Sequence, residues 1–157
     1  MTALRINHVS VHAYDLEESV RFYEELFGME RVPTPRFQED VVWLRLGDQQ
    51  LHVFLRDRAE PPFLHHFGLD VDDFEAVYRK ARKRGLLDGE AFHQPLRRHP
   101  QGWVQMYLRD PAGNLVEVDC PDISTLEPEV QAECGRLEDE VAQTGEASRA
   151  SLYTSRA

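Results

Sequence analysis

The segment HHFGLDVDDFEAVYRKARKRG, residues 65–85, predicts a strand that leads directly into a helix. Polar and apolar side chains alternate over residues 65–71, which is typical of a half-buried strand. The following residues, 73–85, predict a helix, with an aspartate available as its N-cap and Gly85 as its end. Together, a strand and a helix joined by a short acidic turn indicate a mixed α and β fold.

Two histidines stand at the start of this strand, and strand parity separates them. His65 shares a face with Phe67 and Leu69, and this apolar face should pack on helices. His66 lies on the opposite face, with Gly68. We therefore expect His66, and not His65, to point toward whatever the sheet encloses.

The order of strand, helix and paired strands occurs twice in the chain. An offset of 58 residues carries His8 onto His66 and Asp15 onto Asp73. The segments of the first half are a strand at 5–12, a helix at 15–28 and two strands at 41–55 around Gly47-Asp48, and the second half ends with two strands at 103–120. This repeat predicts an α+β domain of two structurally similar halves.

The composition is that of an ordinary globular protein of 157 residues, with 41% hydrophobic and 29% charged residues. The formal net charge of −10 argues against a nucleic-acid partner, since nucleic acids favour basic surfaces. No apolar run approaches the roughly 18 residues that span a bilayer. The N-terminus lacks a signal-peptide pattern, and the two cysteines form no disulfide framework, so we expect a cytoplasmic protein without a membrane partner.

The composition changes after Pro121. Residues 123–157 predict an acidic extension whose end, from about Thr144, is polar and mobile. Apolar residues three or four apart predict a helix laid on the domain or on a partner subunit: Leu126, Val130, Cys134, Leu137 and Val141. We therefore expect a helical extension whose apolar stripe offers a docking surface, either to its own domain or to a partner subunit.

Strand parity places one ionisable residue on the less apolar face of each of four strands. These residues are His8, His52, His66 and Glu117. Imidazoles with a carboxylate suit a divalent ion such as Fe, Mn, Ni or Zn, and two imidazoles with one carboxylate leave positions open for a substrate. Inward histidines are also common as hydrogen-bonded core residues, so parity leaves both interpretations open.

The same parity test identifies candidate substrate contacts. Trp43 and Arg45 lie opposite apolar neighbours on one strand, as do Gln105 and Tyr107 on another. An arginine can pair with a carboxylate or phosphate, and a tyrosine can donate to a developing oxyanion. The alternative is that these side chains are solvated rim residues. The segment 93–103, which carries several basic residues, is expected to be a loop that either covers the site with a preference for anions or is simply solvated.

Three strings of the sequence resemble the vicinal oxygen chelate superfamily, which includes glyoxalases, bleomycin resistance proteins and extradiol dioxygenases. They are NHVSVHAYDLEESVRFYEELFGM at 7–29, HFGLDVDDFEAVYRKARKRG at 66–85 and DPAGNLVEVDC at 110–120. The resemblance implies a domain at 1–122 in which two βαβββ modules, at 3–58 and 64–120, form a cupped sheet around a metal.

In this superfamily the ligands come from the first strand of each module and from the last strand. Carried over, these positions are His8, His66 and Glu117. A fourth position falls on His52, where glyoxalase-like and epimerase-like members usually carry Glu or Gln, so that His52 can be a ligand, a base or a lining residue.

The resemblance therefore implies a divalent metal cofactor (Zn, Ni, Mn or Fe) and a small substrate with adjacent oxygens. Because members of the superfamily often dimerise, it also implies a homodimer. The implied chemistry is that of a glyoxalase-like lyase or isomerase that stabilises an enediolate, with His52 or Tyr107 as the base. An extradiol dioxygenase would use the same ligands with Fe(II) and O₂. A metal-free resistance protein that sequesters its ligand is the third alternative, although such relatives typically lack the ligand triad.

Overall fold

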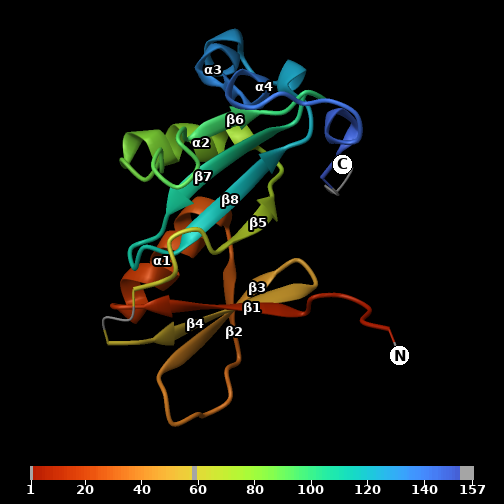
Figure 1. The fold of residues 1–157 in the computed structure, drawn as a ribbon. Helices are drawn as coiled ribbons and strands as arrows, with labels where there is room; N and C mark the ends of the chain where they lie inside the picture. Colours follow the sequence, from red (N-terminus) through yellow and green to blue (C-terminus); the bar gives the residue numbers. More distant parts are fainter. Residues whose placement is uncertain (1, 58–59, 153–157) are drawn as a thin grey trace. The chain divides into compact units, whose positions relative to one another are not determined.

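The computed structural model describes residues 2–57 and 60–152 (Figure 1). The chain divides into two compact units, each of which is described by itself. The first unit comprises residues 1–65 and 110–114, and the second comprises residues 66–109 and 115–157. Each unit has a mixed sheet and a helix between its first two strands, which confirms the α+β class and the internal repeat.

The first unit builds its sheet from strands that follow one another around a single helix. The elements are β1 (His8–Ala13), α1 (Leu16–Phe27), β2 (Glu30–Val32), β3 (Val41–Leu46) and β4 (Gln49–Leu55). The strand order is β1-β4-β3-β2, with β1 parallel to β4 and the other pairs antiparallel. The first strand begins at His8 and not at residue 5, although the Asn7 carbonyl oxygen accepts a hydrogen bond from the Gln50 amide of β4 at 3.1 Å.

Helix α1 has the ends that the sequence predicts. The Asp15 side chain accepts a hydrogen bond from the Glu18 amide at 2.9 Å, and Gly28 ends the helix in the left-handed conformation at φ 64°. The buried face of the helix carries Val20, Phe22, Tyr23 and Leu26, and it lies against strands β3 and β4. Because helix and strand bury one face each, the opposite face of the sheet is left for polar residues.

The second unit repeats the order and adds one strand. Its elements are β5 (His66–Asp70), α2 (Phe74–Lys83), β6 (Leu96–Arg98), β7 (Val104–Arg109), β8 (Leu115–Cys120) and β9 (Gly135–Arg136). The strand order is β5-β8-β7-β6-β9, in which β5 runs parallel to β8. Strand β6 corrects the expectation of a loop over 93–103: three residues are too few for a visible alternation, and the strand also pairs with the distant β9.

The C-terminal extension packs on the second unit but is not one continuous helix. Its elements are η1 (Ile123–Thr125), α3 (Pro128–Glu133), α4 (Leu137–Glu140) and η2 (Ala147–Arg149), with β9 between the α-helices. The apolar stripe divides accordingly, since Val130 is buried whereas Val141 is 57% exposed. The Tyr78 hydroxyl on α2 donates a hydrogen bond to Glu133 at 2.6 Å, which holds α3 of the extension against the second unit. The expected dimer stays a prediction.

Gly135 lets the chain pass close to Gln94 after α3 has ended. A Cβ atom at this position would lie 1.4 Å from Oε1 of Gln94, so a residue with a side chain fits only if Gln94 moves. The glycine allows the backbone to approach β6 and pair with it as β9.

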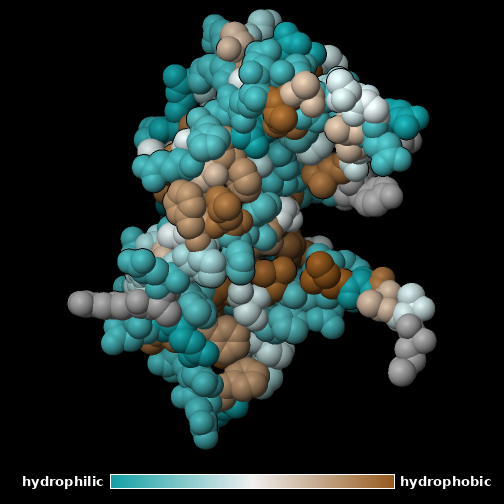
Figure 2. Space-filling view, in the orientation of Figure 1, coloured by the Kyte–Doolittle hydropathy of each residue, from teal (hydrophilic) through white to brown (hydrophobic). Residues whose placement is uncertain are grey.

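Most side chains on the face drawn in Figure 2 are hydrophilic, and hydrophobic ones form separate patches. This agrees with the acidic composition. Within the described residues, every helix is too short or too polar to cross a bilayer.

Candidate metal centre and substrate site

In the second unit, His66 and Glu117 lie together on one face of the sheet. They come from neighbouring parallel strands, and His66 Nε2 is 3.4 Å from Glu117 Oε2. The glutamate side chain is 6% exposed, whereas the imidazole is 32% exposed. This confirms the parity argument for the pair and gives a buried carboxylate beside an accessible nitrogen, which is a suitable pair of metal ligands.

A second buried carboxylate lies beside Glu117. Asp119, also on β8, is 4% exposed, and its Oδ1 has no hydrogen-bond partner among the described residues. Burial, reinforced by the charges of Glu117 and Asp70, raises the pKa of Asp119 to about 8. Sequence reasoning did not single out Asp119, although it shares the parity of Glu117.

Gly68 provides the space for these carboxylates. It is paired with Glu117 across the strands, and a Cβ atom on it would lie 3.3 Å from Asp119 Oδ2 and 3.6 Å from Glu117 Oε1. Two acidic groups buried side by side repel each other unless a proton or a cation intervenes. The donor set of this face therefore fits a divalent cation.

Tyr107 and Gln105 line the same face from β7. The Tyr107 hydroxyl donates to Gln105 Oε1 at 2.9 Å, and its ring lies 4.5 Å from the ring of Phe92 and 6.2 Å from that of His66, measured between centroids. Burial, followed by the charge of Glu117, holds the pKa of Tyr107 well above its usual range. Tyr107 is therefore a hydrogen-bond donor at neutral pH, which disfavours the expectation that it acts as a base.

His99 is held against this group by stacking and a hydrogen bond. Its ring lies 3.4 Å from that of Trp103, and its Nε2 is 2.8 Å from Gln105 Oε1. Because an amide oxygen only accepts, Nε2 carries the proton. Burial is the main cause that lowers the pKa of His99.

The lowered pKa of His99 predicts a pH dependence of stability. As the pH falls below about 6.5, the unfolded chain takes up a proton at this residue before the folded chain does. The free energy of unfolding therefore decreases from about pH 6.5 down to the lower pKa of His99 in the folded chain. We expect the melting temperature of His99→Gln to fall less between pH 7 and pH 5 than that of the wild type. The exposed His65→Gln is the control and should behave as the wild type; equal pH dependence in all three proteins would contradict the assignment.

In the first unit, His8 and His52 stack with Trp43 across three neighbouring strands. The ring centroids of His8 and His52 are 4.3 Å apart, and those of His52 and Trp43 are 4.2 Å apart with nearly parallel planes. Burial, followed by the proximity of His8, lowers the pKa of His52. Trp43 thus packs against the His52 ring and holds its plane. Because its pKa is lowered, His52 is neutral at pH 7.

Amide side chains fix the proton positions of both imidazoles. Asn7 Oδ1 lies 2.5 Å from His8 Nδ1, and Gln50 Oε1 lies 2.9 Å from His52 Nε2. Since both amide oxygens accept, the free lone pairs are on His8 Nε2 and His52 Nδ1. A hydrogen bond to the other ring nitrogen is the usual way in which a metal-binding histidine is oriented.

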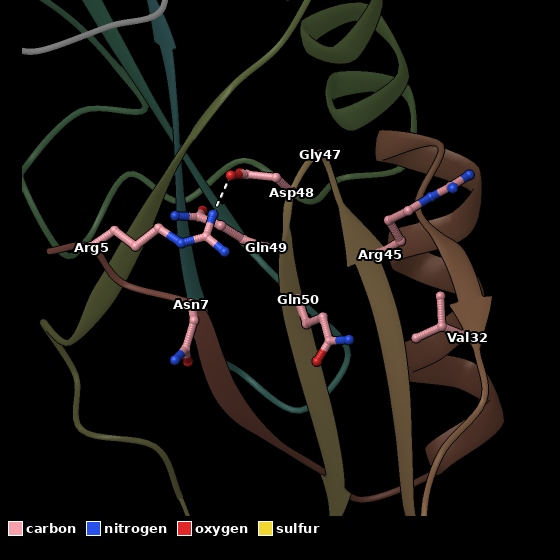
Figure 3. A pocket seen from close by; sticks show the side chains of 8 residues that line it. All are labelled: Arg5, Asn7, Val32, Arg45, Gly47, Asp48, Gln49 and Gln50. Atoms are coloured by element: carbon pink, nitrogen blue, oxygen red, sulfur yellow. Dashed lines mark hydrogen bonds and ion pairs between the residues drawn. The ribbon is translucent and has the colours of Figure 1, made fainter.

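A polar pocket of about 330 Å³ adjoins this histidine pair through Asn7 and Gln50 (Figure 3). Its lining is Arg5, Asn7, Val32, Arg45, Gly47, Asp48, Gln49 and Gln50. Arg45, expected as a substrate contact, is paired with Glu30 of β2, and Arg5 is paired with Asp48. Both pairs are solvent-exposed and therefore weak, so these arginines remain available to an anion.

The predicted site residues thus form two sets. His8, His52, Trp43 and Arg45 belong to the first unit, and His66, Glu117, Tyr107 and Gln105 belong to the second. Within the described residues, no three His, Cys, Asp or Glu side chains are grouped so as to hold a metal ion. The triad of His8, His66 and Glu117 draws on both units and stays a prediction.

The sequence matches a known protein family over most of its length. A family model, "Glyoxalase/Bleomycin resistance protein/Dioxygenase superfamily", matches residues 5–118. The chain belongs to this superfamily. This confirms the resemblance seen in the sequence.

Relatives in the superfamily carry different names. The chain is 29% identical over 131 residues to human mitochondrial methylmalonyl-CoA epimerase, covering 73% of each protein. It is 29% identical over 124 residues to the metallothiol transferase FosB of Lysinibacillus sphaericus, covering 74% of this chain and 82% of that one. A crystal structure of lactoylglutathione lyase from Agrobacterium tumefaciens is similar with a TM-score of 0.57 and 25% identity, over 76% of this chain and 95% of that one.

Proposed function

We propose that this superfamily member is a metal-dependent enzyme that removes a proton from a carbon next to a carbonyl in a small substrate with adjacent oxygens. The observation that carries the proposal is the pair of His66 and the buried Glu117, 3.4 Å apart on an accessible sheet face. His8 supplies the third ligand through its free Nε2. The metal is one of Zn, Ni, Mn or Fe, which all accept imidazole and carboxylate donors.

The metal, when bound, supplies Lewis acidity that stabilises the negative charge developing on the substrate oxygens. Tyr107 donates a hydrogen bond to that charge when its hydroxyl turns from Gln105 to the substrate, because its raised pKa keeps the hydroxyl protonated. The aromatic rings of Phe92 and Tyr107 border His66, with centroids 5.5 and 6.2 Å from that of the imidazole.

His52 is the proposed base. Its lowered pKa keeps the ring neutral at pH 7, and the bond to Gln50 leaves the Nδ1 lone pair free to accept a proton. Stacking between His8 and Trp43 fixes the plane of the ring. His52 therefore takes the place of the carboxylate base that glyoxalase-like relatives use.

The names of the relatives point to the same class of reaction. An epimerase and a lyase of this superfamily both suggest substrates in which a proton lies next to a carbonyl. We therefore take a methylmalonyl thioester and the hemithioacetal of methylglyoxal as the test substrates.

The test is proton exchange in D₂O, followed by NMR at the carbon next to the carbonyl. We expect exchange with metal-loaded protein and none with metal-free protein. His52→Ala should slow the exchange by about 100-fold while metal is retained, because a positioned base contributes about that factor. The matched control is His12→Ala, since His12 lies on the same strand face as His8 and has no role in the proposal.

Two other outcomes would contradict the proposal. Exchange at equal rates with and without metal would remove the metal from the reaction. Oxygen uptake with a catechol after anaerobic Fe(II) loading, in the absence of any proton exchange, would favour ring-cleaving dioxygenase chemistry.

A further inference from the structure

Arg97 is a buried cation on the face of the second sheet that carries the site. It lies on β6 and is paired with Gln105 of β7, so that its side chain shares a face with Gln105 and Tyr107. The residue is 9% exposed. A buried guanidinium is costly unless hydrogen bonds and an opposite charge compensate for the loss of water.

The hydrogen bonds of Arg97 leave this compensation incomplete. Nη2 donates to the Phe92 carbonyl oxygen and to the Glu140 carboxylate, whose oxygens lie 3.1 and 3.4 Å away. The Nε atom is buried and has no hydrogen-bond partner among the described residues. All three of these hydrogen bonds therefore come from Nη2 of the guanidinium. A carboxylate can bind a guanidinium more completely, by accepting two parallel N–H bonds from two of its nitrogens.

The counter-ion comes from outside the family domain. Glu140 is the last residue of α4, in the C-terminal extension, and the family match ends at residue 118. The extension reaches Arg97 because β9 pairs with β6, with Gly135 opposite Arg97. The Gln94 side chain donates to Glu140, and the Glu140 side chain is 35% exposed. The partly exposed carboxylate of Glu140 is thus held beside the buried guanidinium of Arg97 by an ion pair.

We propose that Arg97 is a carboxylate-binding site and that Glu140 occupies it as a built-in competitor, which a ligand carboxylate displaces. The size and charge of the ligand group follow from the occupant, which is itself a carboxylate. The displaced Glu140 can return to water at low cost, since it is already partly exposed. The inference that the substrate itself carries a carboxylate rests on the proposed function. The inference that Arg97 binds a carboxylate does not depend on it.

The test uses metal-free full-length protein and malonate as the probe, so that binding at a metal plays no part. The dissociation constant is measured by NMR titration, with the Arg97 Nε–H resonance as the direct reporter. We expect Glu140→Gln to bind malonate about fivefold or more tightly than the wild type, because the tethered competitor is removed. Asp139→Asn is the matched control: it removes the same charge one residue away, at an exposed position, and should leave the affinity unchanged.

Several results would overturn the inference. Equal affinity in Glu140→Gln and Asp139→Asn would reduce the ion pair to an attachment of the extension. A malonate titration that leaves the Arg97 Nε–H resonance unmoved would place the probe elsewhere, and no substitution at Arg97 is needed to see this. Tighter binding of inorganic phosphate than of malonate would contradict the carboxylate assignment. Metal binding by the same samples is measured separately, so failure of the metal site and failure of the Arg97 site are distinguishable.

Discussion

Replacing Glu117 with glutamine is expected to weaken metal binding by more than about 100-fold, since loss of an outer-shell partner alone costs 10- to 100-fold. The carboxylate is the only proposed anionic ligand, and an amide oxygen is a poorer donor to a divalent ion than a buried carboxylate. The two groups have the same shape, so Tyr107 keeps its neighbour. The measurement is metal content after reloading, with the affinity determined by competition with a chelator.

The control for Glu117→Gln is Glu129→Gln, which removes the same charge from an exposed position on α3. It should retain about one metal per chain. Equal metal content in both variants would contradict the ligand assignment. If the wild type itself held no metal after reloading, the protein would be better described as a metal-free binding protein.

Replacing Asp110 with alanine is expected to destabilise the protein by about 3–5 kcal/mol, the range for breaking a buried charged network. Asp110 is 4% exposed, and within the described residues its carboxylate accepts four hydrogen bonds. Its Oδ1 accepts from the amides of Ala112 and Asn114 at 3.0 and 2.8 Å. Its Oδ2 accepts from the Tyr23 hydroxyl at 2.8 Å and from Asn114 Nδ2 at 2.7 Å.

The loss at Asp110 would come from donors left unsatisfied in the interior. Urea unfolding measures it. Tyr23→Phe removes a single bond of the network and should cost about 1–2 kcal/mol. Asp122→Ala removes an exposed carboxylate that also accepts a backbone amide, from Ser124 at 2.8 Å, and should have a much smaller effect than Asp110→Ala. Similar losses in the two alanine variants would show that burial of the network contributes little.

Much of the fold could be predicted because its signals are local. Asp15 and Asp73 cap their helices as expected, and Gly28 ends α1 in the conformation that glycine favours. The short strands β2, β6 and β9 could not be predicted, since two or three residues show no alternation, and β9 depends on its distant partner β6. Strand β9, which lies between α3 and α4, brings Gly135 close to Gln94, an approach that no local pattern reveals.

For the site, strand parity was sufficient to predict which face of the sheet a side chain lies on, but not which side chains of neighbouring strands it contacts. It put His66 and Glu117 on one face, where the structure has them 3.4 Å apart. Two relations depend on strand register, which the sequence did not determine: the stacking of His52 on Trp43 and the pairing of Arg45 with Glu30. Asp119 shares the parity of Glu117 on β8, but parity alone does not show that both carboxylates are buried. Arg97 was expected in a loop because its strand gains order only from neighbours on both sides.

Anomalous X-ray diffraction from crystals of the metal-loaded protein is the most direct test of the central claim, that His8, His66 and Glu117 hold one divalent metal. We predict one strong peak per chain, about 2.0–2.2 Å from an imidazole nitrogen of each histidine and from the Glu117 carboxylate. The absence of a peak at these residues, or a fully occupied metal held only by other side chains, would contradict it.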